Sequence, residues 1–122
     1  VRLGSIDAAV AAFTHAAEAR GSLVSTMALY RLGQLERGRD NAEAAVAYFD
    51  RLLETPRNLF PREEALIAKA RAFQEAGDAR AALENYQKVV DEFGDSYTAA
   101  EARTQISELS AQLGLDPDIE GN

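Results

Sequence analysis

The sequence predicts an all-α fold of about six helices packed as antiparallel pairs. Three observations support this prediction. Apolar residues recur at helical spacing, residues that end or start helices recur along the chain, and one apolar pattern occurs three times. No strand is predicted. With 122 residues and 47% hydrophobic content, the chain has the size and composition of one globular domain.

The first two predicted helices cover residues 6–20 and 23–37. Gly4-Ser5 precedes the first helix and Gly21-Ser22 precedes the second. A serine side chain accepts a hydrogen bond from the free N–H groups of a first helical turn, and glycine tolerates the left-handed conformation just past a last turn. Each glycine–serine pair therefore predicts a helix boundary.

The third and fourth predicted helices cover residues 41–55 and 62–76. Asp40 and Glu43 have the spacing of a capping box, in which two side chains satisfy free N–H groups at a helix start. Pro61 suits a first helical position, where no backbone N–H is needed. These residues predict where the two helices begin.

The last two predicted helices cover residues 79–93 and 96–113. Gly77-Asp78 precedes the first of them, and Gly94-Asp95-Ser96 separates it from the second. Gly114 follows the last helix. Because aspartate and serine are good N-caps and glycine is a good residue just past a helix, these groups predict both connections.

Three apolar stripes share the spacing i, i+4 and i+7, which places each on one face of a helix. They consist of Ala9, Phe13 and Ala16; of Ala45, Phe49 and Leu52; and of Ala82, Tyr86 and Val89. The stripes are 36 and 37 residues apart, so the helix pairs repeat. Glycine inside a helix costs about 1 kcal/mol relative to alanine. We therefore expect a partner helix to approach closely at Gly33, within the predicted helix 23–37.

The distribution of charge excludes a nucleic-acid partner. The formal net charge is −7, and the whole excess lies in residues 91–122, which carry eight acidic residues and one arginine. Nucleic-acid binding needs clustered cations, and no basic stripe occurs elsewhere. The longest apolar runs hold six residues, whereas a membrane-spanning helix takes about 20. We therefore expect no membrane span in this segment.

No group of residues predicts catalysis, a metal site or a cofactor. His15 is the only histidine and cysteine is absent, which makes a poor basis for a metal site. Glu63 and Glu64 are adjacent and would point about 100° apart on a helix, so they are interpreted as favourable charge at its N-terminus. No phosphate-binding loop or nucleophile elbow occurs. The chain is therefore expected to be no enzyme.

The repeated residues resemble the tetratricopeptide repeat, whose pattern is W-x2-L-G-x2-Y, then A-x3-F, then P over 34 residues. The matching residues are Leu29, Leu32, Gly33, Ala45, Phe49, Phe73, Gly77-Asp78, Ala82 and Tyr86. Leucine replaces tryptophan, Lys69 stands where leucine is expected, and Glu36 replaces tyrosine. The resemblance covers residues 5–113 and implies a right-handed superhelical solenoid of antiparallel helix pairs.

The resemblance divides the chain into a repeat domain, residues 1–114, and an acidic, disordered tail, residues 115–122. The domain contains a partial repeat at 1–22, repeats at 23–58 and 59–95, and a terminal helix at 96–113. Because the chain begins inside a repeat, we expect Val10 and Phe13 to be covered by a second copy or by missing chain of a parent protein.

The resemblance implies a protein–protein interaction scaffold whose first helices line a concave groove. Mapped position by position, the groove residues are Met27, Tyr30, Gln34, Arg37, Glu64, Ile67, Arg71 and Gln74. Two arginines suit a peptide with a carboxylate, which arginine holds by two parallel hydrogen bonds. The lysine–asparagine pair of chaperone-binding relatives is absent from these positions.

The segment from Asp91 to Ala102 also resembles a junction in bacterial cell-envelope members, with Gly94 in place of proline. Those relatives coordinate the Tol–Pal system or assist outer-membrane protein assembly. The resemblance implies a periplasmic or cell-envelope assembly rather than the cytoplasm. Two alternatives remain open, a regulatory or spacer segment of a longer enzyme and a self-associating structural protein.

Overall fold

The computed structural model describes residues 3–18, 22–56 and 58–115, and within these ranges the chain forms six α-helices and no strand. The helices are α1 (Leu3–Glu18), α2 (Ser22–Gly38), α3 (Ala42–Glu54), α4 (Arg62–Glu75), α5 (Ala79–Phe93) and α6 (Tyr97–Gln112). The predicted all-α fold is confirmed. None of the helices in these ranges is both long enough and apolar enough to cross a membrane.

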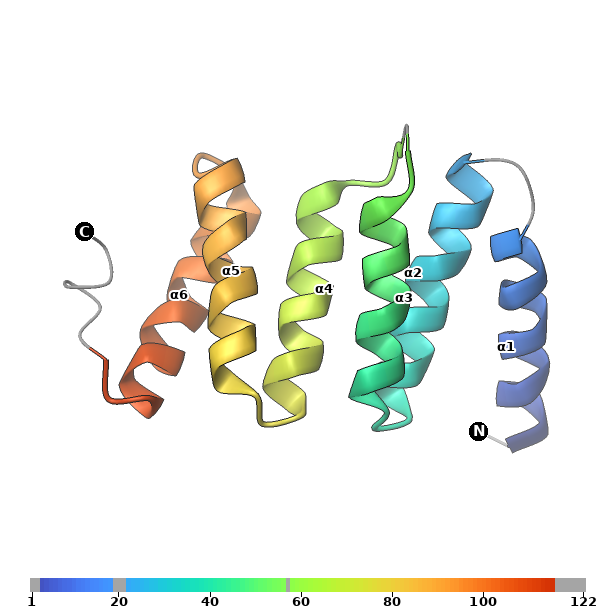
Figure 1. The fold of residues 1–122 in the computed structure, drawn as a ribbon, viewed down its shortest axis with the longest axis horizontal. Helices are drawn as coiled ribbons and strands as arrows, with labels where there is room; N and C mark the ends of the chain where they lie inside the picture. The colour runs from blue at the N-terminus through green and yellow to red at the C-terminus, as the bar shows by residue number, and fades with distance from the viewer. Residues whose placement is uncertain (1–2, 19–21, 57, 116–122) are drawn as a thin grey trace.

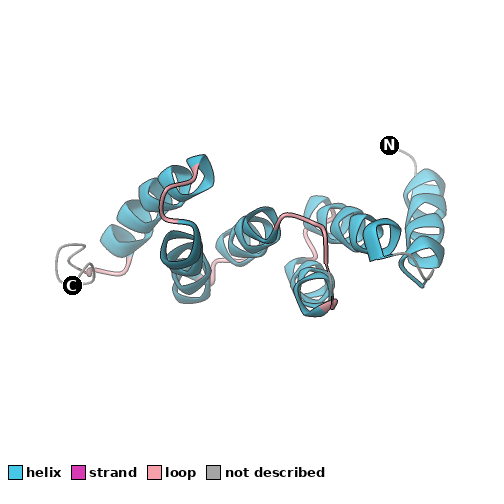
Figure 2. Ribbon diagram, turned by 90° about the horizontal axis from the view of Figure 1, so that it is seen from above, coloured by secondary structure: helices cyan, strands magenta, loops and turns pink. Residues whose placement is uncertain are grey.

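The helices stand side by side in one row, each antiparallel to the next, with α1 and α6 at opposite ends of the row (Figure 1). From above, α3 and α5 lie on one side, whereas α2, α4 and α6 lie on the other (Figure 2). Helix α4 also contacts both α2 and α6 directly. The result is a helical solenoid in which every second helix lines one face.

Two of the three predicted apolar stripes form the core of the solenoid. The stripes of α3 and α5 are at most 1% exposed at every position. The stripe of α1 differs, because Ala9, Phe13 and Ala16 are only partly buried. The covering of apolar surface is therefore complete in the middle of the row and incomplete at α1.

The close approach predicted at Gly33 is confirmed. A Cβ atom added to this glycine would lie 2.3 Å from Cε1 of Phe49, which is 0% exposed. The absence of a side chain at Gly33 therefore leaves the space that the Phe49 ring occupies. This contact joins α2 to α3, the two helices of one repeat.

The predicted boundaries of α5 and α6 are also confirmed. Asp78 Oδ1 accepts a hydrogen bond from the N–H of Ala81 at 3.2 Å, and Ser96 Oγ accepts one from Ala99 at 3.0 Å. Gly77 and Gly114 have φ angles of 85° and 73°, the left-handed conformation that glycine adopts most easily just past a helix.

The prediction that Asp40 starts the third helix is wrong. Asp40 has a φ angle of 62° and ends α2 instead. Its N–H donates to the carbonyl of Arg37 at 3.1 Å, and the N–H of Asn41 donates to that of Glu36 at 2.8 Å. These two bonds form the Schellman motif, which ends a helix with a residue of positive φ. Glycine is the most common residue at that position, and aspartate is one of the few others that tolerate a positive φ. Asn41 precedes α3 without a capping side-chain bond.

The prediction for the first helix is corrected as well. Helix α1 begins at Leu3, so Gly4-Ser5 lies within the helix instead of before it. Of the second glycine–serine pair, Ser22 begins α2 and Gly21 lies outside the described residues. The predicted tail likewise lies outside them, apart from Leu115.

Candidate functional site

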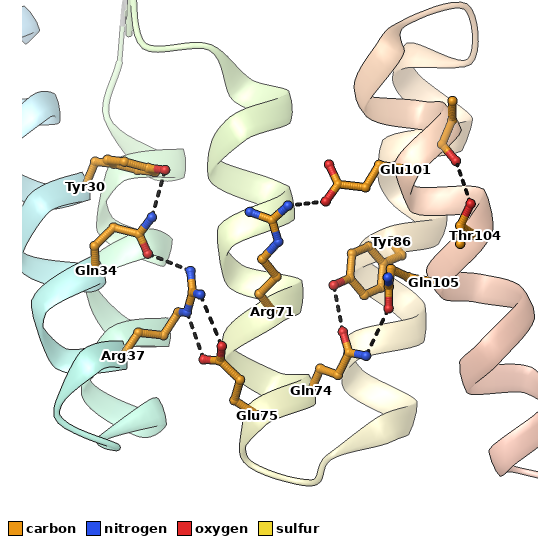
Figure 3. Close-up of polar contacts among 11 residues, drawn as sticks. Tyr30, Gln34, Arg37, Arg71, Gln74, Glu75, Tyr86, Glu101, Thr104 and Gln105 are labelled. Carbon is orange, nitrogen blue, oxygen red and sulfur yellow. Dashed lines mark hydrogen bonds and ion pairs between the residues drawn. The ribbon is translucent and has the colours of Figure 1, made fainter.

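Polar side chains from α2, α4 and α6 form a set of three separate hydrogen-bonded groups along one face of the solenoid (Figure 3). We call this set the polar row. It consists of Tyr30, Gln34 and Arg37 of α2, of Arg71, Gln74 and Glu75 of α4, and of Glu101 and Gln105 of α6.

At the α2 end of the polar row, Arg37 joins α2 to α4. Its Nε donates to Glu75 Oε1 at 2.8 Å and its Nη2 donates to Glu75 Oε2 at 3.1 Å. Its Nη1 donates to Gln34 Oε1 at 2.7 Å, and Gln34 Nε2 donates to the hydroxyl of Tyr30 at 2.9 Å. Four side chains are thus held in one orientation, because arginine bridges a carboxylate and an amide.

In the middle of the polar row, Arg71 joins α4 to α6 by donating from Nη2 to Glu101. Burial opposes the positive charge of Arg71, but the hydrogen bond and the negative charge of Glu101 outweigh this effect and raise the pKa of Arg71. The guanidinium is therefore charged at every accessible pH.

Gln74 makes the third connection between the helices. Its Nε2 donates to Gln105 Oε1 at 3.0 Å, and its Oε1 accepts from the hydroxyl of Tyr86 on α5 at 2.8 Å. Burial raises the pKa of Tyr86, because the phenolate is poorly solvated there, although the positive charge of Arg71 acts against this rise. The core of the α4–α5 pair is thus linked to the polar row.

The ring of Tyr30 is held by packing as well as by its hydroxyl. It lies 4.7 Å from the ring of Phe60, in the connection between α3 and α4, and 6.0 Å from that of Phe49, measured between ring centroids. Tyr30 therefore gives the polar row a fixed aromatic edge at α2.

The structure brings five of the eight predicted groove residues into the polar row, namely Tyr30, Gln34, Arg37, Arg71 and Gln74. Met27 and Glu64 are exposed outside it. Ile67 is only 2% exposed and belongs to the hydrophobic core, so it offers no surface to a ligand.

Three residues of the polar row were not predicted, Glu75, Glu101 and Gln105. A signal for two of them is present in the sequence, because Glu101 and Gln105 follow Ile67 and Arg71 by 34 residues, the length of one repeat. These acids change the chemistry of the site. Both arginines already hold a carboxylate of the neighbouring helix, so a ligand carboxylate would have to displace Glu75 or Glu101.

No cluster of three or more histidine, aspartate or glutamate side chains in the described part of the chain is arranged to hold a metal ion. The polar row is instead built of hydrogen-bonding groups that suit a peptide, namely amides, guanidinium groups and carboxylates.

Comparison with known proteins finds two family models that match this chain. Both are described as tetratricopeptide repeat, and they match residues 1–58 and residues 64–96. Together the two ranges cover most of the chain. No curated protein matches the sequence.

Proposed function

Because the chain belongs to the tetratricopeptide repeat family, whose stacked repeats form concave binding surfaces, we propose that it is a non-enzymatic scaffold that binds a peptide or helix of a protein partner. The binding surface is the face lined by α2, α4 and α6, and the polar row is its centre.

The observation that carries this proposal is the spread of the polar row over helices from successive repeats, because Arg37 and Glu75 join α2 to α4 and Arg71 and Glu101 join α4 to α6. Packing of the helices requires apolar contacts, and it does not require half-buried amides and ion pairs to run from α2 to α6. Side chains that are already hydrogen-bonded lose little rotamer freedom when a ligand binds. The polar row is therefore a pre-ordered surface with donors and acceptors for a peptide backbone.

A selection of displayed random dodecapeptides on the immobilised protein tests this proposal. We expect binders with dissociation constants of about 1–100 μM, as is usual for a single peptide site of modest size. The double substitution Arg37→Ala and Arg71→Ala should weaken their binding at least about tenfold, measured by fluorescence anisotropy. The ion pairs are partly exposed, so each contributes about 0–1 kcal/mol and the melting temperature should fall by only a few degrees.

Arg80→Ala is the matched control, because Arg80 is exposed on α5, away from the face that α2, α4 and α6 line. It should leave peptide binding unchanged. Recovery of no binding peptide, or of peptides that bind the double variant as well as the unchanged protein, would contradict the proposal.

We also propose that the partner belongs to a bacterial envelope assembly. The support is the resemblance of the segment from Asp91 to Ala102 to the junction in cell-envelope members. In the structure this segment contains the end of α5 and the start of α6, with Ser96 as the cap. Fractionation of cells that express the intact gene product tests the location, and recovery in the cytosolic fraction alone would contradict it.

A further inference from the structure

A cavity between α1 and α2 lies beside the polar row and has a different chemistry. Its volume is about 600 Å³. Ile6, Phe13 and Leu35 give it an apolar lining, and Arg31 and Arg39 also border it. This volume is in the range of cavities that bind ligands in other proteins.

A second cavity of about 280 Å³ continues the first along α2 and shares Phe13 and Arg31 with it. Val24 and Met27 line this part, and they are 56% and 48% exposed. We call the two cavities together the α1–α2 cleft. The cleft extends from Val24 on α2 to Arg39 just past its end, and the helical part from Val24 to Gly38 is about 21 Å long at 1.5 Å per residue. An extended segment of about seven residues would span this length.

The cleft is a positive site in a negatively charged molecule. No acidic residue lines either cavity within the described part of the chain, although the formal net charge of the protein is −7. Arg39 is paired with the nearly buried carboxylate of Glu36 at 3.0 Å. Arg31 is exposed and has no hydrogen-bond or ion-pair partner among the described residues. Its charge is therefore available to a ligand.

A neighbouring polar depression, beside the α1–α2 cleft, differs from the cleft in the charge of its lining. It is lined by Arg37, Glu75 and Asp40, so its one positive charge is already paired with Glu75 and the lining is negative overall. It shares Gln34 and Gly38 with the cleft. One bound chain can thus cross from the cleft onto the polar row.

We propose that the α1–α2 cleft binds a segment of the protein partner in which apolar side chains lie next to acidic residues. The apolar side chains bury the exposed surface of Phe13, Val24 and Met27, and a carboxylate pairs with Arg31. This inference rests on the proposed function and names the chemistry of the partner. The charge complementarity of the cleft selects acidic segments over basic ones.

Two substitutions change the cleft without disturbing the core. Arg31→Glu reverses the free charge at an exposed position. Gly38→Leu adds an apolar side chain inside the cleft, where a Cβ atom would meet no other atom within 4 Å. Because Gly38 ends α2 in an ordinary helical conformation, leucine fits there without backbone strain.

The peptides from the dodecapeptide selection serve as the probe. We expect them to carry acidic residues beside leucine, isoleucine, phenylalanine or methionine. Their binding should weaken at least about tenfold in Arg31→Glu and in Gly38→Leu. Two matched controls, Arg80→Glu on α5 and Ala47→Leu on α3, make the same chemical changes at exposed positions away from the cleft and should leave binding unchanged.

The outcomes separate this inference from the proposed function. Loss of affinity with the substitutions at Arg37 and Arg71 but not with those at Arg31 and Gly38 would support the proposed function. It would contradict the proposal that the α1–α2 cleft binds the partner. Enrichment of basic peptides would also overturn it. Two occupants compete with the partner segment, namely the two that the sequence predicts over Val10 and Phe13, a second copy of the chain and missing chain of a parent protein. If analytical ultracentrifugation detects a dimer and Gly38→Leu dissociates it, the cleft is occupied by a second copy of the chain. This result would contradict the proposal that a segment of the partner binds there.

Discussion

At the scale of single residues, Gly33 sets how closely α2 and α3 pack. The Phe49 ring fills the place that a side chain at this position would take, and the ring is fully buried. Alanine would favour the helix by about 1 kcal/mol, but its methyl group would overlap the ring. The overlap makes the net effect of alanine on stability unfavourable, because a ring enclosed in a packed core has little room to move.

We therefore expect Gly33→Ala to lower the free energy of unfolding by about 1–3 kcal/mol, the usual cost of an overpacked core. Urea denaturation measures this change. Gly38→Ala is the control, since its Cβ atom would meet nothing within 4 Å, and it should be neutral or stabilising.

A double variant shows whether the ring is the cause. In Gly33→Ala combined with Phe49→Leu, the smaller side chain makes room for the methyl group. The combined loss of stability should then be smaller than the sum of the two single losses, because the two sites share one space. Additive losses would show that the Phe49 ring does not limit the space at Gly33.

The contacts of Lys69 explain one departure from the repeat pattern. It stands where leucine is expected, and its Nζ pairs with Asp50 Oδ1 of α3 at 2.6 Å. The side chain is 16% exposed, so its carbon chain still covers apolar surface as leucine would. Glu36 similarly replaces tyrosine, and its carboxylate accepts from Asn41 Nδ2 at 2.7 Å beside the turn at Asp40.

At the scale of helices, an ion pair joins the start of α4 to the end of α5. Arg62 Nε donates to Glu92 Oε1 at 2.7 Å and Arg62 Nη2 donates to Glu92 Oε2 at 3.3 Å. The hydrogen bond from Arg62 lowers the pKa of Glu92 below its ordinary value of 4.5. The pair contributes stability above this ordinary value, and the contribution is lost as the pH falls through the lowered pKa.

We expect Glu92→Gln to lower the free energy of unfolding by a few tenths of a kcal/mol near pH 7, because both side chains are well exposed and solvent screens them. The difference from the unchanged protein should shrink between pH 7 and pH 2, because Glu92 takes up a proton as the pH falls through its lowered pKa. Urea denaturation at the two pH values measures it.

Glu84→Gln is the control for this pair. Glu84 is exposed on the same helix and has no ion-pair partner among the described residues. It should change stability little at either pH. An effect of Glu92→Gln that is equal near pH 2 and near pH 7 would show that lost packing, and not charge, is responsible.

Helix boundaries were predictable where they depend on neighbouring residues. Asp78 and Ser96 bond to N–H groups three positions along the chain, so their roles are visible in the sequence. Asp40 was assigned to the wrong helix because aspartate can serve both as an N-cap and as a residue of positive φ. The choice depends on the carbonyl of Glu36, which accepts the N–H of Asn41.

At the scale of the whole molecule, the repeated stripes predicted the repetition of helix pairs and the family resemblance implied the solenoid, whereas the polar row was not predicted as a whole. Arg37 and Glu75 are 38 residues apart and Arg71 and Glu101 are 30 apart. Which side chains meet across α2, α4 and α6 depends on how far each helix is rotated and shifted against the next. Sequence spacing fixes neither quantity, so the sequence predicted two groove arginines suited to a ligand carboxylate but not that each is paired within the chain.

The incomplete covering of α1 within the described residues also depends on its place in the row. The stripes of α3 and α5 have helices on both sides, because each lies between two helices in the row. The described part of the chain packs α1 against α2 alone. The position of the α1–α2 cleft follows from this difference, since apolar surface that is buried in the middle of the row stays accessible there.

The ion pairs across the solenoid also bear on how such a chain can change during evolution. The junction of α2 with α4 uses Arg37 and Glu75, whereas that of α4 with α6 uses Arg71 with Glu101 and Gln74 with Gln105. The two junctions are chemically different, so the repeats are not interchangeable modules. A duplication or deletion of one repeat would therefore bring different side chains together at the new junction.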